Sequence, residues 1–169
     1  MKNELLPPKR RLQIIGEIND EGYKEFSEAL YKLEYESKNP VTVELNSFGG
    51  DVTAALAYAA RIRVCTAPVY VIAYGQVYSA AVLILASGHK RIMTKECWAM
   101  VHEEFAKIKG EVKELEKEIK HLRRLEIQWN DMLQVLTKLD SKKWEALHKA
   151  TTYMDAKECL AAGLVDIII

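Results

Sequence analysis

One serine and one histidine of this chain stand where they could carry out acyl transfer. Ser79 follows a glycine-bearing turn and opens an apolar segment, 79–86, with helical character. Such a position places its hydroxyl and the next backbone N–H at the positive end of a helix, where a nucleophile can be activated. Gly49 and Gly50 form a second strand-to-helix turn, and glycines there can present backbone N–H groups to a developing negative charge. His102 ends a third apolar stretch and is a candidate general base.

Each of these residues also has a simpler structural interpretation. A serine before a helix is often an N-cap, and a glycine pair is often only a tight turn. The other histidines, His89, His121 and His148, fall in a turn or on charged helix surfaces and are predicted to be solvated. A nucleophile, a base and backbone donors would nevertheless make an acyl-transfer site if the fold brings them together.

Alternating strands and helices are expected to position these residues. Short β-branched stretches alternate with helical periodicity through the first half of the chain, and glycine-bearing loops join them. This order is typical of an α/β fold with a mainly parallel sheet, whose functional groups gather at the carboxyl ends of the strands. The predicted strands are 12–15, 41–45, 69–73, 92–93 and 99–101, and the predicted helices are 19–36, 51–63 and 79–86.

A long amphipathic helix is predicted for the second half of the chain. Apolar side chains recur every three or four residues from Val112 to Leu136, between Glu and Lys. At about 28 residues this helix would extend roughly 40 Å, which is more than a domain of this size covers, so part of it is expected to pack on another subunit. The chain is then expected to form a helix over 141–149, a capped helix over 155–163 and a final strand over 164–169.

Composition restricts the functions that the protein could have. The chain has 169 residues, 24 basic and 24 acidic side chains, and a formal net charge of zero. One domain spanning 1–169 is expected from this length, and the lack of a basic field argues against nucleic-acid binding. No stretch is long and apolar enough for a signal peptide or a membrane span, so a cytoplasmic protein is expected. Cys65, Cys97 and Cys159 lack zinc-site or disulfide spacing and are predicted to be buried thiols.

Four motifs in order give the chain a resemblance to a known family. They are NSFGGDVTA over 46–54, GQVYSAA over 75–81, MVH over 100–102 and AGLVD over 162–166. With these motifs the chain resembles the ClpP peptidase family over almost its whole length. The resemblance implies a ClpP/crotonase-like fold of repeated β-β-α units, with a long handle helix in the region 107–139 and a short extended tail over 1–10.

The same resemblance implies roles for individual residues. Ser79 matches the nucleophile, His102 the base, and Gly50 and Ala80 the backbone donors of the oxyanion hole. It also implies a homo-oligomer of stacked heptameric rings, a tetradecamer that encloses a chamber for polypeptide substrates, with no cofactor and no metal. Docking on a AAA+ ATPase unfoldase is left open, because only about ten residues precede the first predicted strand.

Three residues depart from the family pattern. Phe48 and Glu104 stand where the family has prolines, and Thr151 stands at the position of the triad acid. A threonine hydroxyl can hold the imidazole ring, but it carries no charge to stabilise the imidazolium. Alternation along a strand would turn Glu103 away from His102 and leave only Glu104 on its side.

The sequence therefore predicts a ClpP-type serine endopeptidase with a Ser79–His102 dyad and weakened activity. The alternative, which the missing acid would permit, is a catalytically silent ring subunit with a structural or regulatory role. Crotonase-like acyl-thioester chemistry would share the oxyanion hole, but it would not explain a serine and a histidine at the peptidase positions.

Overall fold

A mainly parallel sheet forms the centre of the molecule. The computed structural model describes residues 10–103 and 109–169, so the predicted tail lies outside it except for Arg10. The strands are β1 Arg11–Ile18, β2 Val41–Gly50, β3 Val69–Tyr78, β4 Lys90–Met93, β5 Trp98–Val101, β6 Thr152–Met154 and β7 Ile167–Ile168. Their order is β1-β2-β3-β4-β7, with β5 paired to β3 and β6 paired to β5. The β5–β6 pair is antiparallel and the other pairs are parallel.

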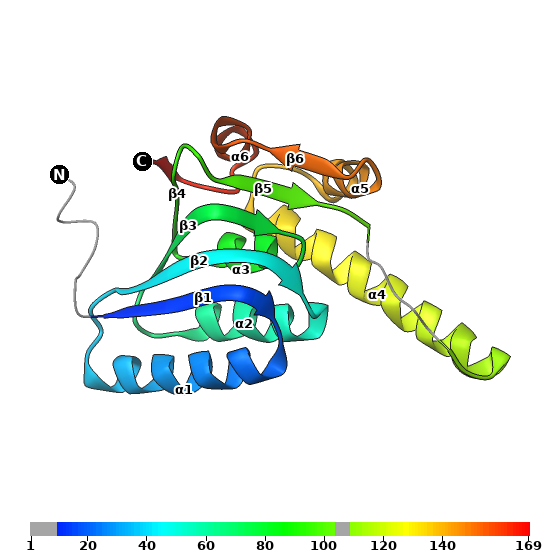
Figure 1. Cartoon of the computed structure of the whole chain (residues 1–169), viewed down its shortest axis with the longest axis horizontal. Helices are drawn as coiled ribbons and strands as arrows, with labels where there is room; N and C mark the ends of the chain where they lie inside the picture. The colour runs from blue at the N-terminus through cyan, green and yellow to red at the C-terminus, as the bar shows by residue number, and fades with distance from the viewer. Residues whose placement is uncertain (1–9, 104–108) are drawn as a thin grey trace.

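Helices pack against this sheet and bury apolar side chains of its strands. They are α1 Asp20–Glu36, α2 Val52–Val64, α3 Ala81–Ala86, α4 Val112–Leu136, α5 Ser141–Lys149 and α6 Ala156–Ala162. In Figure 1, α1 and α2 run along one side of the sheet, α5 and α6 lie near β6, and α4 reaches away from the body. The core contains the fully buried side chains of β2 and β3, among them Val43, Leu45 and Val71. The alternation of strands and helices confirms the α/β class predicted from the sequence.

Three strands continue past the residues where the sequence predicts turns. β1 passes through Gly16, β2 runs on to Gly50, and β3 runs on to Tyr78. Register shifts interrupt both ladders, and pairing resumes after them. Gly16 and Gly75 have φ values of 83° and 62°, which glycine adopts without strain. The segments that carry the candidate site are therefore held by the sheet itself.

β3 divides the sheet into two branches. Its first half, 70–73, pairs with β4, and its second half, 76–78, pairs with β5. Gly75 lies at the bend between the two halves. Because β3 and β5 run parallel, the residues that follow them, Ser79 and His102, emerge at the same end of the sheet.

Helix ends in the C-terminal third follow local sequence signals. Asp155 and Glu158 form the predicted capping box at the start of α6, and Gly163 ends this helix with a φ of 72°. The predicted final strand over 164–169 is shorter in the structure, where β7 covers only Ile167–Ile168 and the N–H of Asp166 just before it donates to Arg91 O at 2.8 Å. All three cysteines are buried and free, as predicted.

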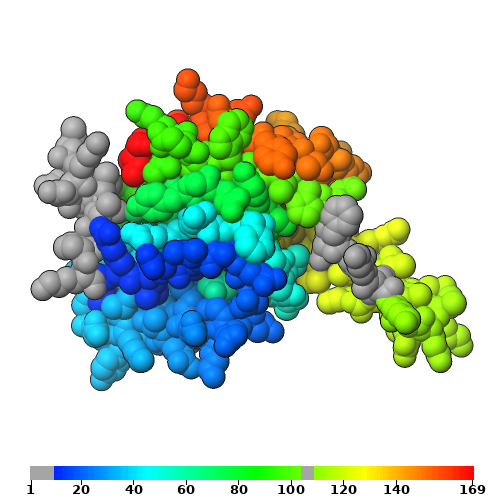
Figure 2. Space-filling view, in the orientation of Figure 1, coloured from blue at the N-terminus to red at the C-terminus, as the bar shows by residue number. Residues whose placement is uncertain are grey.

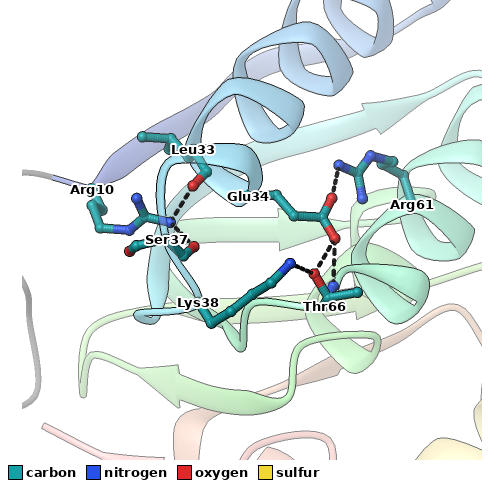
Figure 3. A network of polar contacts seen from close by, with 7 residues as sticks. All are labelled: Arg10, Leu33, Glu34, Ser37, Lys38, Arg61 and Thr66. Carbon is teal, nitrogen blue, oxygen red and sulfur yellow. Dashed lines mark hydrogen bonds and ion pairs between the residues drawn. The ribbon is translucent and has the colours of Figure 1, made fainter.

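A polar network ties α1 to α2 and to the loop before β3 (Figure 3). Glu34 accepts hydrogen bonds at 2.6 Å from Arg61, from the Thr66 hydroxyl and from the Thr66 N–H. Lys38 donates to the same hydroxyl, and Arg10 donates to carbonyls near the end of α1. The two Thr66 hydrogen bonds and the Arg61 guanidinium lower the pKa of Glu34 from its ordinary value of 4.5 to about 2. These polar contacts, together with apolar packing, therefore hold α1 against the rest of the molecule.

Within the described residues, α4 packs on the body mainly through its C-terminal half. Its buried residues are Trp129, Asn130 and Leu133. Toward its other end Val112 is 71% exposed and Ile119 is 43% exposed. Figure 1 and Figure 2 show this part extending beyond the rest of the molecule. The helix has 25 residues, close to the predicted length, and much of its apolar stripe is not buried against the described residues.

Candidate active site

Ser79 lies where β3, β5 and α3 meet. Its backbone N–H donates to Met100 O at 2.7 Å, and its carbonyl oxygen accepts from Val82 N at 3.0 Å. Its φ is 53°, in the left-handed region that residues other than glycine rarely adopt. Strain of this kind persists only where the surrounding structure imposes it, and it is typical of a nucleophile on a sharp strand-to-helix turn.

The interpretation of Ser79 as a helix cap is wrong. α3 begins at Ala81, its N-cap position is Ala80, and no side chain caps the helix. Ala80 is buried, and its N–H bonds to no carbonyl of the described residues. That N–H is therefore available to a ligand beside Ser79.

The Gly49–Gly50 turn lies directly against Ser79. A Cβ built on Gly49 would stand 2.8 Å from Ser79 Cβ and 2.8 Å from Tyr78 O, and a Cβ on Gly50 would stand 2.2 Å from Ile18 O. The φ values of the two glycines are 101° and 150°. Because no other residue fits these contacts and dihedrals, the turn needs glycine at both positions. The backbone of this turn thus borders the serine.

Ser47 braces the glycine turn from inside the sheet. Its side chain is fully buried, and its hydroxyl donates to Gly16 O at 2.6 Å and accepts from Gly49 N at 3.0 Å. The sequence prediction assigns this residue only to a polar turn. The available signal was a serine two residues before a glycine pair, which is a common local side-chain-to-backbone motif.

His102 follows β5 with one ring nitrogen fixed. Nδ1 lies 2.5 Å from the carbonyl oxygen of Glu103. A carbonyl oxygen only accepts hydrogen bonds, so Nδ1 carries the proton in this arrangement. This tautomer leaves the lone pair on Nε2, which is the form that a general base requires.

One pocket of about 250 Å³ brings these groups together. Gly50, Ser79, Ala80 and His102 line it from three segments of the chain. Its opposite wall is built by α4 and α5 and was not foreseen from the sequence. The lining residues on these helices are Leu125, Glu126, Trp129, Asn130 and His148. A serine, an imidazole and the backbone of a glycine turn around one pocket are the elements of an acyl-transfer site.

Thr151 does not line this pocket, although the sheet brings it near His102. The last rung of the β5–β6 ladder pairs Val101 with Thr152, so the next residues outward are His102 and Thr151. Thr151 is exposed and has a φ of 48°. Its backbone N–H donates to His148 O at 3.0 Å, whereas its hydroxyl bonds to no residue of the described chain.

The structure places the backbone of Glu103 beside His102. β5 ends at Val101, so strand alternation no longer applies beyond it, and Glu103 lines the pocket together with His102. The backbone carbonyl of Glu103 is also the group that holds the imidazole. Glu104, the other candidate to replace the acid, lies outside the described residues.

The prediction of a solvated His148 is wrong as well. The ring is buried on α5, with its centroid 6.2 Å from that of Trp144, and it lines the candidate pocket. Desolvation by burial lowers the pKa of His148 from 6.5 to about 4, although the Trp144 carbonyl opposes this shift. The ring is therefore neutral at pH 7. His89 and His121 are exposed, as predicted.

No group of three or more His, Cys, Asp or Glu side chains in residues 10–103 and 109–169 could hold a metal ion. None of the helices formed by these residues is long and apolar enough to cross a membrane.

A parallel sheet with a strained serine at one strand end, and with a glycine turn and an imidazole beside it, is typical of a serine hydrolase. Comparison with known proteins gives the family. The family model described as Clp protease matches residues 2–169. The chain belongs to the Clp protease family.

Named relatives agree with this assignment. The ATP-dependent Clp protease proteolytic subunit 2 of Treponema denticola is 32% identical over 162 residues, covering 94% of this chain and 81% of the relative. The protein of the same name from Gluconobacter oxydans is 28% identical over 168 residues, covering 95% and 74%. A solved structure of a ClpP1 mutant from Listeria monocytogenes matches with a TM-score of 0.87 and 27% identity, covering 95% of this chain and 91% of that one. The predicted ClpP-type fold and family resemblance are thus confirmed.

Proposed function

We propose that the chain is a serine endopeptidase of the ClpP type that hydrolyses peptide bonds in unfolded proteins or short peptides. Ser79 is the nucleophile, His102 is the general base, and the N–H groups of Gly50 and Ala80 form the oxyanion hole. The observation that carries this proposal is the close approach of the glycine turn to Ser79, at the pocket that His102 also lines.

The reaction proceeds through an acyl-enzyme. Ser79 Oγ attacks the scissile carbonyl carbon while its proton passes to His102 Nε2. The two backbone N–H groups donate to the oxyanion of the tetrahedral intermediate, and His102 then gives the proton to the leaving amine. Water attacks the resulting ester by the same proton transfers, which releases the new carboxyl terminus and regenerates the serine.

In a triad, the acid both orients the imidazole ring and stabilises the charge of the imidazolium. At this site a group is present for the first task only. The Glu103 carbonyl orients the ring through Nδ1. Neither that carbonyl nor the Thr151 hydroxyl carries a charge to stabilise the imidazolium. An uncharged replacement of the acid costs about 10⁴-fold in kcat in the serine-protease template, while the oxyanion hole and binding retain a residual rate. Turnover by this protein is therefore slow.

The uncovered half of α4 supports assembly into stacked heptameric rings. A tetradecamer would cover the apolar stripe and enclose Ser79 in a chamber that polypeptide substrates enter. Both curated relatives are named as ATP-dependent proteases, which supports a AAA+ ATPase unfoldase as the partner that delivers folded substrates. Short peptides would need no such partner.

A catalytically silent ring subunit is the second candidate function. One observation favours it: the position of the triad acid carries an exposed, uncharged Thr151 that does not line the pocket. Such a subunit would keep the fold and the assembly without turnover.

Peptide hydrolysis separates the two functions. We expect slow cleavage of a fluorogenic peptide by the assembled protein, none by Ser79→Ala, and a loss of about 10²–10⁴-fold in kcat for His102→Ala. Ser27→Ala, on α1, is the matched control and should retain the wild-type rate. A wild-type rate equal to that of Ser79→Ala would favour the silent subunit.

A further inference from the structure

On α4, both apolar and polar residues line the pocket beside Ser79. Leu125 and Trp129 form one row on this helix, and Glu126 and Asn130 form a second row beside it. Residues four apart on a helix are neighbours on its surface, so the two residues of each row form one continuous part of the pocket wall. One row is apolar and the other carries hydrogen-bond acceptors.

The charged residues that line this pocket are all acidic. Asp51, Glu103 and Glu126 line it, and no Lys or Arg is among its described lining residues. Lys149, on α5, does not line the pocket and is paired with Glu145 at 2.6 Å, and its charge also acts on Glu103 and Glu126. Charges of one sign in a concave site raise the local concentration of the opposite charge. The site therefore attracts cations.

A second observation, independent of these carboxylates, also indicates a ligand. Asn130 is 4% exposed, and its side-chain oxygen has no hydrogen-bond partner in the described structure. Buried polar groups are nearly always satisfied, and leaving one unsatisfied is unfavourable. Because Asn130 lines the pocket one turn beyond Glu126, a donor at the end of a long side chain would reach both residues.

We propose that this pocket receives a lysine or arginine side chain of the substrate, on the residue that supplies the scissile carbonyl, so that cleavage follows basic residues. The inference rests on the proposed peptidase function. The methylene stem of the substrate packs on Leu125 and Trp129, and its cationic head reaches Glu126 and Asn130. An acidic side chain is repelled, and an apolar one leaves both acceptors unsatisfied.

A peptide series tests this specificity. The peptides are identical fluorogenic substrates except for the last residue before the scissile bond, which is lysine, norleucine or glutamate. Norleucine has an apolar chain of similar length without the ammonium group. We expect kcat/KM for lysine to exceed that for norleucine by about tenfold or more, with glutamate lowest, and the preference to shrink at high salt.

Variants of α4 test whether Glu126 causes the preference for the lysine peptide. Glu126→Gln should bring the lysine-to-norleucine ratio close to one, and Glu126→Lys should make the glutamate peptide the better substrate of the series. Glu118→Gln, which removes the same charge from an exposed position of the same helix, should leave the ratio at its wild-type value. A ratio unchanged in both Glu126 variants would overturn the proposal.

Binding distinguishes a failure of this inference from a failure of the proposed function. The Ser79→Ala protein cannot turn over, so its affinity for the lysine and norleucine peptides reports the pocket alone. Tighter binding of the lysine peptide, by about fivefold or more, supports the inference even if the wild type cleaves nothing, and then only the peptidase function fails. Equal affinities, or tighter binding of norleucine, overturn the inference even if the wild type cleaves peptides.

Discussion

At the scale of single residues, backbone strain is concentrated at the end of the sheet that carries the candidate site. Ser79 and Thr151 are the non-glycine residues with positive φ in the described chain. Each such conformation costs about 1–3 kcal/mol, and a β-branched threonine is especially ill suited to it. One lies at the nucleophile position, and the other lies next to the rung that leads to His102. Both strained residues thus lie beside the candidate site, and Thr151 carries no carboxylate.

Replacing Thr151 by aspartate is expected to raise turnover. A carboxylate there would stabilise the imidazolium of His102, and aspartate tolerates left-handed backbone better than threonine does. We expect Thr151→Asp to increase kcat for a small peptide ester by about tenfold or more, with 10⁴-fold as the upper limit set by the serine-protease template. Thr151→Asn, which relieves the same strain without adding charge, is the control. Equal rates for the two variants would show that charge is not what the site lacks.

The sequence predicts Ser79, His102 and Gly50 as candidate site residues but does not predict the burial of His148, and there is a physical reason for this difference. Ser79, His102 and Gly50 lie in short ordered motifs that resemble those of the family, and this resemblance implies their roles. His148 has charged neighbours along its helix, but α5 packs against α4, and His148 lines the same pocket as residues of α4. Burial of this kind depends on long-range packing, which helical periodicity over nine residues does not encode.

At the scale of secondary structure, local signals fix the helix ends, whereas the sheet fixes the strand ends. Caps such as the box at Asp155 need only a few neighbouring residues, so the sequence predicts them well. The extensions of β1, β2 and β3 through glycine depend on bulges that form only against a partner strand. The sequence therefore predicts turns where the structure continues its ladders.

The network of Figure 3 makes the attachment of α1 dependent on pH. The pKa of Glu34 is lowered to about 2 in the folded state, so its contribution to stability is complete above its ordinary pKa of 4.5. That contribution disappears as the pH falls from about 4.5 to about 2. We expect Glu34→Gln to lower the free energy of unfolding by about 1–3 kcal/mol at neutral pH. The difference from wild type should shrink as the pH falls through this window.

Urea unfolding at a series of pH values measures this effect. Glu28→Gln, at an exposed position of the same helix, is the matched control and should change the free energy of unfolding little. A difference between wild type and Glu34→Gln that stays constant down to about pH 3 would mean that the Thr66 and Arg61 contacts do not depend on the carboxylate charge.

At the scale of the whole molecule, α4 is the helix whose apolar side chains the other described residues leave largely exposed. Leu115 and Leu122 lie in the N-terminal half of α4, which contains none of its buried residues. Burying apolar surface contributes about 25 cal/mol per Å², so pairing of such helices between rings would favour assembly. We expect Leu115→Glu with Leu122→Glu to split a tetradecamer into single rings or smaller species in analytical ultracentrifugation, since the interface would then bury unpaired charges.

A conservative pair provides the control for this assembly prediction. Leu115→Met with Leu122→Met keeps the apolar surface and should keep the mass of the wild type. Wild-type protein that sediments as a monomer at micromolar concentration would contradict the role of α4 in assembly, and so would a charged double variant of full mass.

The central claim, that Ser79 is an activated nucleophile, is tested most directly by covalent labelling. A fluorophosphonate probe forms a bond to a serine Oγ with loss of fluoride, and it reacts appreciably only where a base takes the proton and backbone donors receive the oxyanion. Mass spectrometry of the digested protein then identifies the labelled residue. We predict labelling of the peptide that contains Ser79, its loss in Ser79→Ala and strong reduction in His102→Ala. Folded wild-type protein that stays unlabelled at every pH, or that is labelled at another serine, would contradict the account.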